Sequence, residues 1–165
     1  MTFTTTRCLI RPFAQQDIEP FMAYRNDLEW MQHQSFKGLT YEAYERALLG
    51  EQAITQGMQL AIIDQETNEL IGDLYVQQDR TTYWIGYTIS PRRARQGYAS
   101  EVVSGLIRHL SDQGVETIKA GCLPTNEASI ALLKKLNFVY LTTEDKERIY
   151  QFDVSRYKGP RHDIP

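Results

Sequence analysis

The feature that most constrains the fold is an apolar stripe in the second half of the chain. Its members are Ala99, Val102, Val103, Leu106, Ile107 and Leu110. Steps of three and four residues place all of these side chains on one face of an α-helix. A helix with one apolar face is stable only when that face packs against another layer. The rest of the chain must therefore supply a sheet or further helices that cover it.

The segments around this helix alternate between strand-like and helix-like patterns. The sequence predicts strands over residues 4–11, 58–64, 69–77, 81–90, 115–122, 138–143 and 148–154. It predicts helices over residues 14–27, 40–53, 99–110 and 125–137. The order is β-α-α-β-β-β-α-β-α-β-β, in which the helices cannot all gather at one end. We expect an α+β fold of mixed α/β character, with a central mixed, mostly antiparallel sheet and helices on both faces.

The length and composition fit one domain. The chain has 165 residues, of which 42% are hydrophobic and 24% charged, which is enough for a sizeable core. We expect a single domain over residues 1–154. Residues 155–165 contain glycine and proline and almost no apolar side chains, so we expect them to form a mobile C-terminal tail.

Composition also excludes several function classes. The formal net charge of -3 argues against a nucleic-acid partner. The sequence has no apolar run of about 18 residues and no secretory pattern at its start, so we expect no membrane partner. Two cysteines, Cys8 and Cys122, are too few for a disulfide framework and favour a cytoplasmic location. The three histidines show no metal-ligand spacing, so we expect no metal.

Positive charge and a glycine stand where the helix of the apolar stripe begins. Arg92, Arg93 and Arg95 precede Gly97 there. A helix N-terminus carries unpaired N–H groups and a partial positive charge, and a glycine lets an anion approach closely. The pattern predicts a phosphate-binding turn, although neither a P-loop nor a dinucleotide fingerprint is present. A polar loop with an incidental glycine is the alternative.

Three ordered segments resemble the GNAT superfamily of N-acetyltransferases. The segment "IGYTISPRRARQGYASEVV", residues 85–103, is similar to its central motif, in which a strand and a proline lead into Q/R-x-x-G-x-G/A. The opening "TTRCLIRPFAQQDIEPFMAYRND" and the later "NEASIALLKKLNF" resemble two further segments of one branch. That branch contains ribosomal-protein N-terminal acetyltransferases and related small-molecule acetyltransferases.

The resemblance implies a GNAT-like sheet and acetyl-CoA as co-substrate. It places the pyrophosphate on the glycine turn and the backbone of Ile89 against the pantetheine arm or the thioester oxygen. It further implies that Asn126 reaches the pantetheine and that Ser129 meets the sulfur. The cofactor-binding residues expected on this basis are Ile89, Arg95, Gln96, Gly97, Tyr98, Ala99, Asn126 and Ser129.

The chain departs from the family pattern at some positions. Ala94 and Arg95 replace frequent motif residues, and Asn137 stands where glycine is usual. Leu133 replaces the tyrosine that serves as the general acid. This replacement makes Ser129 the candidate that assists the departing thiolate.

An attacking amine must also lose a proton, because a free amine is mostly protonated at neutral pH. The candidate bases are Asp73, Glu101, Glu144 and Asp145, and we leave the base unassigned among them. Asp73 is unusual because it interrupts an apolar strand, so we name Asp73 and Ser129 as the candidate catalytic residues.

Aromatic side chains in the first half of the chain have two interpretations. Trp30, Phe36, Tyr41 and Tyr44 either line the acceptor pocket or pack in the core. A later strand carries Tyr83, Trp84 and Tyr87, which are expected mainly to pack across strands, although one face of that strand must look into the cleft.

The predicted function is acetyl-CoA-dependent transfer of an acetyl group to a primary amine by direct attack on the thioester. The acceptor is a small molecule or a peptide N-terminus, and the protein is a monomer or homodimer. The alternative is a non-catalytic CoA-binding sensor or regulatory module of the same fold, which Leu133 supports.

Overall fold

The computed structural model describes residues 1–154 of the chain. The strands are β1 (Phe3–Thr4), β2 (Cys8–Pro12), β3 (Met58–Asp64), β4 (Leu70–Asp79), β5 (Thr82–Ile89), β6 (Thr117–Cys122), β7 (Val139–Glu144) and β8 (Glu147–Asp153). The helices are α1 (Ile18–Arg25), α2 (Tyr41–Leu49), α3 (Tyr98–Ser111) and α4 (Glu127–Lys135), with the short 3-10 turns η1 (Gln15–Asp17) and η2 (Pro91–Arg93). Residues 155–165, for which we expect a mobile tail, lie outside the described residues.

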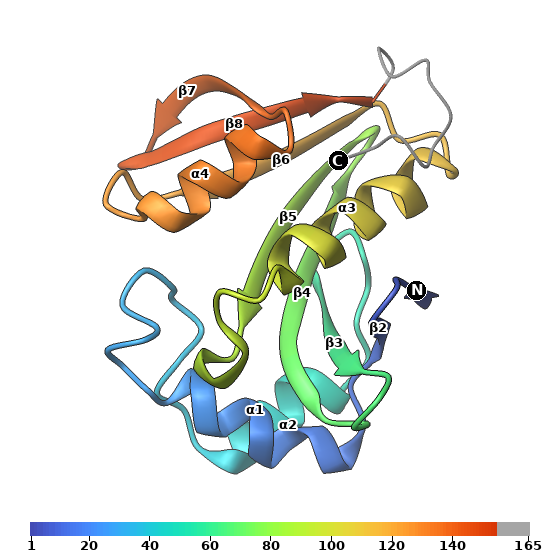
Figure 1. The fold of residues 1–165 in the computed structure, drawn as a ribbon, viewed down its shortest axis with the longest axis vertical. Coiled ribbons are helices and arrows are strands. Elements are labelled where there is room, and N and C mark those ends of the chain that lie inside the picture. Colours follow the sequence, from blue (N-terminus) through green and yellow to red (C-terminus); the bar gives the residue numbers. More distant parts are fainter. Residues whose placement is uncertain (155–165) are drawn as a thin grey trace.

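The strands form one sheet in the order β1-β2-β3-β4-β5-β6-β8-β7 (Figure 1). The β5–β6 pair is parallel, and the other neighbouring pairs are antiparallel. The final two strands form a hairpin in which Glu144 faces Glu147 across the turn. These pairings confirm the expected mixed, mostly antiparallel sheet.

The first predicted strand is the clearest difference in element boundaries. The sequence predicts one strand over residues 4–11, whereas the structure has β1 and β2 separated by a turn. The N–H of Thr5 donates to the C=O of Cys8 at 2.9 Å and closes this turn. The N–H of Arg7 donates to a carboxylate of α3, so this part of the chain bonds to a helix instead of a strand.

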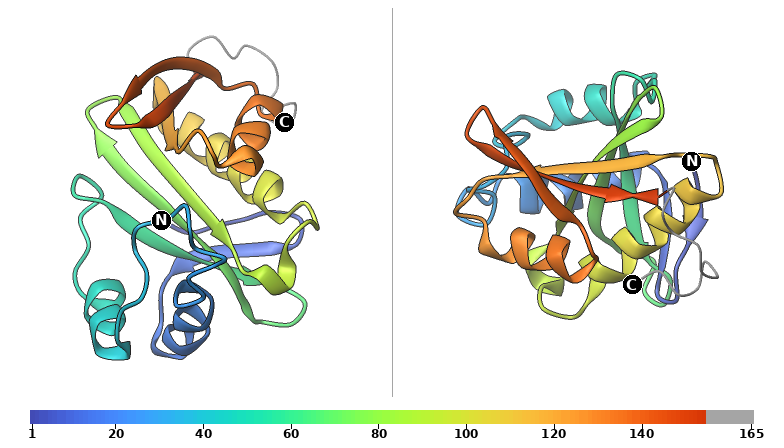
Figure 2. Two further views of the ribbon diagram at one scale, coloured as in Figure 1. Left: turned by 90° about the vertical axis from the view of Figure 1, so that its left-hand side faces the viewer. Right: turned by 90° about the horizontal axis from the view of Figure 1, so that it is seen from above.

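Alternating side chains of β3 show how the sheet separates two layers of helices. Leu60 and Ile62 belong to a large core with α3 and α4, whereas Ala61 and Ile63 pack in a smaller core with α1 and α2. Figure 2 (right) shows the strands between α2 on one side and α3 and α4 on the other. Helices therefore cover both faces, as expected.

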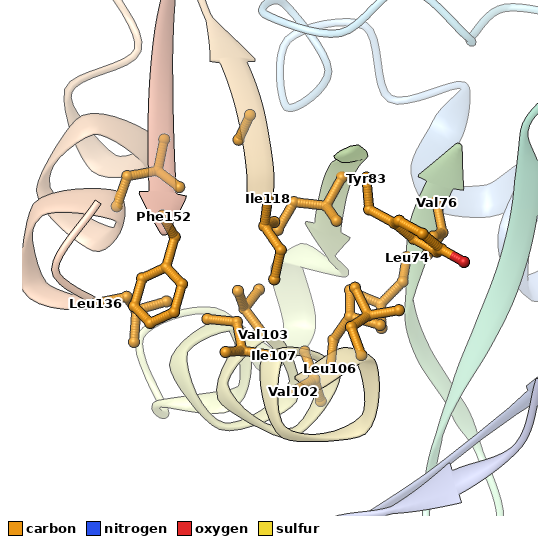
Figure 3. Close-up of a cluster of buried hydrophobic side chains, with 14 of the residues drawn as sticks. Leu74, Val76, Tyr83, Val102, Val103, Leu106, Ile107, Ile118, Leu136 and Phe152 are labelled. Carbon is orange, nitrogen blue, oxygen red and sulfur yellow. The ribbon is translucent and has the colours of Figure 1, made fainter. Parts of the chain in front are cut away.

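The apolar stripe of α3 is the centre of the large core. Val102, Val103, Leu106, Ile107 and Leu110 are fully buried. Figure 3 shows α3 side chains pointing towards residues of β4, β5, β6 and β8. One helix face thus holds together strands on both sides of the β5–β6 pair.

The β5–β6 pair is short. Residues 82–84 of β5 pair with residues 117–119 of β6, and the two strands then diverge (Figure 1). The divergence leaves one edge of β5 without a neighbouring strand from Ile85 to Ile89. The sheet is consequently split by a V-shaped opening.

A buried ion pair attaches α1 to the centre of the sheet. Arg25 of α1 lies 2.6 Å from Asp73 of β4, and their side chains are 4% and 1% exposed. Arg25 also donates to the C=O of Phe36 and to the hydroxyl of Thr88, and Tyr24 donates to Asp73. This network explains why a carboxylate interrupts an apolar strand.

We expect Asp73→Ala to lower the free energy of unfolding by about 3–5 kcal/mol, because it leaves Arg25 charged and buried without its partner. Urea denaturation followed by circular dichroism measures this change. Glu69→Ala is the control, since Glu69 pairs with Arg93 at 3.2 Å but is 58% exposed, and it should change stability by less than about 1 kcal/mol. Equal effects of the two substitutions would contradict the anchoring role of Asp73.

Candidate active site

Two cavities meet at the V-shaped opening. The large cavity has a volume of about 750 Å³ and extends from the turn at residues 93–100 to the first turns of α4. The small cavity has a volume of about 360 Å³ and lies between β5, β6 and the β7–β8 turn. The residues that line both are His33, Gln34, Tyr87, Asn126 and Ser129. These shared residues form what we call the junction.

The turn ahead of α3 presents unpaired backbone donors to the large cavity. Arg95 and Gly97 have positive φ angles of 62° and 81°, and this curls the chain before the helix begins. Within the described residues, the N–H groups from Arg95 to Ala99 donate to no other backbone or side-chain atom. Such a group of N–H donors at a helix N-terminus is suited to bind an anion.

Arg7 fixes this turn from the β1–β2 connection. Its guanidinium stacks on the ring of Tyr98 at 3.9 Å and donates to the C=O of Gln96 at 3.0 Å. It also pairs with Glu101 of α3 at 2.6 Å, and Glu101 accepts a further bond from Thr5. Burial acts to raise the pKa of Glu101, but these hydrogen bonds hold this pKa below its usual range. Glu101 is therefore part of the support of the turn.

The three predicted arginines have different positions. Arg93 lines the large cavity, but it pairs with Asp64 at 2.5 Å and with Glu69. Arg95 also lines the cavity, and among the described residues it has no ion-pair partner. Arg92 does not line it. Positive charge at this turn thus comes mainly from Arg95 and the helix N-terminus.

The end of β5 directs backbone groups into the opening. Ser90 donates its N–H to the C=O of Ile71 in β4 at 2.8 Å. Because backbone groups alternate in direction along a strand, the N–H and C=O of Ile89 point to the other side, towards the opening. The C=O of Ile89 accepts a bond from the indole N–H of Trp30 at 3.0 Å. The backbone of Ile89 therefore faces the opening.

Hydroxyl and thiol groups converge at the junction. The Tyr87 Oη lies 2.7 Å from the Ser129 Oγ, and the N–H of Ser129 donates to the Asn126 side chain at 3.2 Å. Burial raises the pKa of Tyr87 to about 12, partly offset by its bond with Ser129. Burial also raises the pKa of Cys122, and the nearby Ser129 hydroxyl again acts in the opposite direction.

Most of the predicted cofactor residues line the large cavity. They are Ile89, Arg95, Gly97, Tyr98, Ala99, Asn126 and Ser129. Gln96 does not line the large cavity, and its C=O accepts a bond from Arg7. Leu133, at the position of the family's tyrosine, is fully buried in the large core.

The candidate bases lie apart from one another. Asp73 lines neither cavity, and its carboxylate is buried in the ion pair with Arg25 of α1. Both facts argue against a role of Asp73 as the base. Glu144 also lines neither cavity, whereas Asp145 lines the small one. Of the four candidates, Asp145 alone lines a cavity.

Some site residues were missed or left open by the sequence. Tyr87 lines both cavities, and the alternation of β5 is the signal that could have placed it on the open face. Trp30 lines the large cavity, whereas Phe36 and Tyr44 pack in the smaller core and Tyr41 bonds with Gln15. The sequence carries no local signal that would separate these aromatics.

Among the described residues, no group of three or more His, Cys, Asp or Glu side chains could hold a metal ion. None of the helices within residues 1–154 has the length and apolarity to cross a membrane.

Comparison with known proteins defines the family. The family described as "Acetyltransferase (GNAT) domain" matches residues 7–139. The chain is 31% identical over 144 residues to the uncharacterized N-acetyltransferase YoaA of Bacillus subtilis. This match covers 81% of this chain and 80% of YoaA. The chain therefore belongs to the GNAT acetyltransferase family, and it is an acetyltransferase.

Solved structures share the fold. A GNAT-family acetyltransferase of Bacillus anthracis superimposes with a TM-score of 0.84 at 22% identity, covering 94% of this chain and 100% of the other. RimL, a ribosomal L7/L12 alpha-N-protein acetyltransferase in complex with coenzyme A, gives a TM-score of 0.80 at 16% identity, covering 93% and 98%. At these identities the likeness concerns the fold alone.

We expect Gly97→Val to weaken binding of acetyl-CoA at least tenfold, about 1.4 kcal/mol, because a branched side chain would obstruct the turn and its N–H groups. Calorimetry on the folded variant measures the affinity. Gly114→Val is the matched control, because Gly114 has a similar φ of 78° and no atom within 4 Å of an added Cβ. It should show the same backbone strain with unchanged affinity, and unchanged affinity in Gly97→Val as well would reject the turn as the binding site.

Proposed function

We propose that the protein transfers the acetyl group of acetyl-CoA to a primary amine by direct attack of the amine on the thioester. The observation that carries this proposal is the meeting of the two cavities at Tyr87, Asn126 and Ser129. A donor in the large cavity and an acceptor in the small one would approach each other there. Holding two reactants in this way lowers the entropic barrier to their reaction.

The large cavity fits the donor. Acetyl-CoA would supply the acetyl thioester when bound. The unpaired N–H groups from Arg95 to Ala99 would hold its pyrophosphate, and the left-handed turn at Gly97 leaves room for the phosphates. Ile89 and Asn126 would hold the pantetheine arm. The backbone N–H of Ile89 is directed into the opening, where it could stabilise a negative charge on the thioester oxygen.

The small cavity fits a cationic acceptor. Asp145 and Glu147 line it, and among its described lining residues there is no lysine or arginine. These carboxylates attract a protonated amine, and Arg148, which pairs with Cys122 across the strands, offsets part of their charge. Asp145, directly or through water, would take the proton that the amine must lose before attack.

The acceptor is a small amine or a flexible peptide N-terminus. The small cavity is bordered by the tight turn of the β7–β8 hairpin and lies between strands, which leaves little room for a folded partner. An internal lysine of a folded protein would have to enter together with its surroundings. The name of RimL, which acts on the N-terminus of a ribosomal protein, supports including peptide N-termini.

The second candidate function is a non-catalytic CoA sensor. Leu133 favours it, because this apolar, fully buried side chain replaces the tyrosine expected to protonate the leaving group. Binding of CoA without consumption of acetyl-CoA in the presence of any amine would select the sensor over the enzyme.

We expect acetylation of small primary amines or peptide N-termini when the enzyme and acetyl-CoA are incubated with separate pools of amines, N-terminal peptides and intact proteins. The narrow small cavity is the physical reason for this preference. Mass spectrometry identifies the modified molecules. Acetylation confined to internal lysines of folded proteins would overturn the proposed acceptor class.

We expect Asp145→Asn and Glu147→Gln each to raise the KM for an aliphatic diamine about twofold to fivefold, as an exposed charge pair is worth about 0.5–1 kcal/mol. The effect on the monoamine of the same length should be smaller, because it carries one charge fewer. Steady-state kinetics with putrescine and butylamine compare the two. Glu144→Gln is the control on the same hairpin, and an equal effect there would show that only the overall charge matters.

A further inference from the structure

We propose that Tyr87 is a positioning residue that directs the Ser129 hydroxyl proton towards the sulfur of the leaving group. The Tyr87–Ser129 pair would thereby replace the tyrosine that is missing at Leu133. This inference rests on the proposed function, because it assigns a role within acetyl transfer from the thioester.

The geometry brings the two hydroxyls together from distant parts of the chain. Tyr87 belongs to β5 and Ser129 to the first turn of α4, and their side-chain oxygens lie 2.7 Å apart. The other acceptor near the Tyr87 hydroxyl is the C=O of Ser129, at the less favourable distance of 3.4 Å. The short contact between the hydroxyls is therefore the dominant interaction of Tyr87.

The chemistry of the two groups sets the direction of this bond. A phenol is a stronger acid than an aliphatic alcohol, so Tyr87 donates and the Ser129 Oγ accepts. Burial raises the pKa of Tyr87 to about 12, so its hydroxyl keeps its proton throughout the neutral range. The Ser129 hydroxyl has a single proton, and while its oxygen accepts from Tyr87 that proton is left for another acceptor.

A sulfur atom already belongs to the wall of the small cavity, where Cys122 and Ser129 are both lining residues. Burial raises the pKa of the Cys122 thiol, and the Ser129 hydroxyl acts in the opposite direction. The Ser129 hydroxyl thus already acts on a sulfur that lines this cavity. A departing thiolate would be a stronger acceptor than the neutral thiol of Cys122, because bonds to charged groups are stronger.

The position of Leu133 explains why the donor comes from β5. Leu133 follows Ser129 by one helical turn, and its side chain is fully buried in the large core. Ser129 also lies in the first turn of α4, where the helix N-terminus favours negative charge. The junction thus retains a hydroxyl donor and a favourable field without a tyrosine on α4.

The step balances with these residues unchanged. A C–N bond forms between the acceptor nitrogen and the acetyl carbon, and the C–S bond breaks with its electron pair on sulfur. The Ser129 hydroxyl donates a hydrogen bond to that sulfur while Tyr87 continues to donate to Ser129. The acceptor nitrogen loses one proton to Asp145 before the attack and a second once the C–N bond has formed. The second proton passes through solvent in the small cavity to the sulfur, so free CoA leaves as a thiol and the first proton is released to solvent.

The first test measures the thiol of bound CoA without any turnover. The ultraviolet absorbance of the thiolate is followed against pH for CoA bound to the wild type, Tyr87→Phe, Ser129→Ala and the double variant, and the same protein without CoA is subtracted. Loss of one hydrogen bond to a charged group should raise the pKa of the bound thiol by about one unit in each single variant, a tenfold change. The double variant should match Ser129→Ala, because Tyr87 acts through Ser129.

Tyr83→Phe is the matched control for this titration. Tyr83 lies on the same strand, is 7% exposed and lines neither cavity, and its hydroxyl forms no hydrogen bond among the described residues. It should leave the pKa of bound CoA unchanged. Three results would each overturn the proposal. The pKa of bound CoA could stay unshifted in Tyr87→Phe, it could shift further when Tyr87→Phe is added to Ser129→Ala, or it could shift equally in Tyr83→Phe.

The second test uses steady-state kinetics with an amine that the wild type acetylates. Tyr87→Phe should lower kcat about tenfold and leave the KM for acetyl-CoA unchanged, because the bond strengthens as charge develops on sulfur. A raised KM with unchanged kcat would assign Tyr87 to cofactor binding and reject the positioning role. If the wild type acetylates no amine, the proposed function fails, and the CoA titration still decides the role of Tyr87.

Discussion

The parallel pairing of β5 with β6 extends over only three residues on each strand, and the candidate site exists because it stops there. Backbone groups inside a protein need hydrogen-bond partners, and the second half of β5 has no strand on one edge to supply them. Trp30 satisfies the C=O of Ile89, while other groups face the opening. A parallel pair also requires a crossover connection, and here that connection is α3. The turn ahead of α3, with its unpaired N–H groups, consequently lies at the carboxyl end of β5, directly beside the opening.

Two separate cores support the two sides of this opening. The large core, centred on α3, joins β4 and β5 to β6 and β8 and so fixes the angle between the diverging strands. The smaller core holds α1, α2 and the segment that lines both cavities, with Met31 and Phe36 among its members. Arg25 links the two layers, because it binds Asp73 and Thr88 of the sheet as well as the C=O of Phe36. The shape of the acceptor side therefore depends on buried contacts that lie outside both cavities.

Local pattern was sufficient for most of the elements and for the left-handed turn at Gly97 ahead of α3. The spacing of the α3 stripe and the position of Gly97 each predict a local structure that depends on few other residues. Asp73 shows where this reasoning stops, because the residue that neutralises it lies 48 positions away. Glu101 and Arg93 are similar, since their roles depend on Arg7 of the β1–β2 connection and on Asp64 of β3. Charged side chains in this protein acquire their functions through partners that sequence spacing does not bring together.

Tyr87 shows a different limit of the sequence. Alternation along β5 separates its residues into two faces, but it does not say where the neighbouring strand leaves the sheet. Only after β6 diverges does a side chain at this position meet α4 and both cavities. The same divergence explains why Tyr83, on the same strand, is buried in the large core.

The two cavities are bordered by different elements. The turn ahead of α3 is fixed by Arg7 and by Glu101 of α3, whereas the wall of the small cavity includes Asp145 and Glu147 of the β7–β8 hairpin. Tyr87 and Ser129 lie between these sides and line both cavities. Changes in the hairpin can therefore alter the charge and shape presented to an acceptor without moving the N–H groups of the turn. Under the proposed function, the same donor site could serve different acceptors, because the residues that line both cavities are confined to the junction.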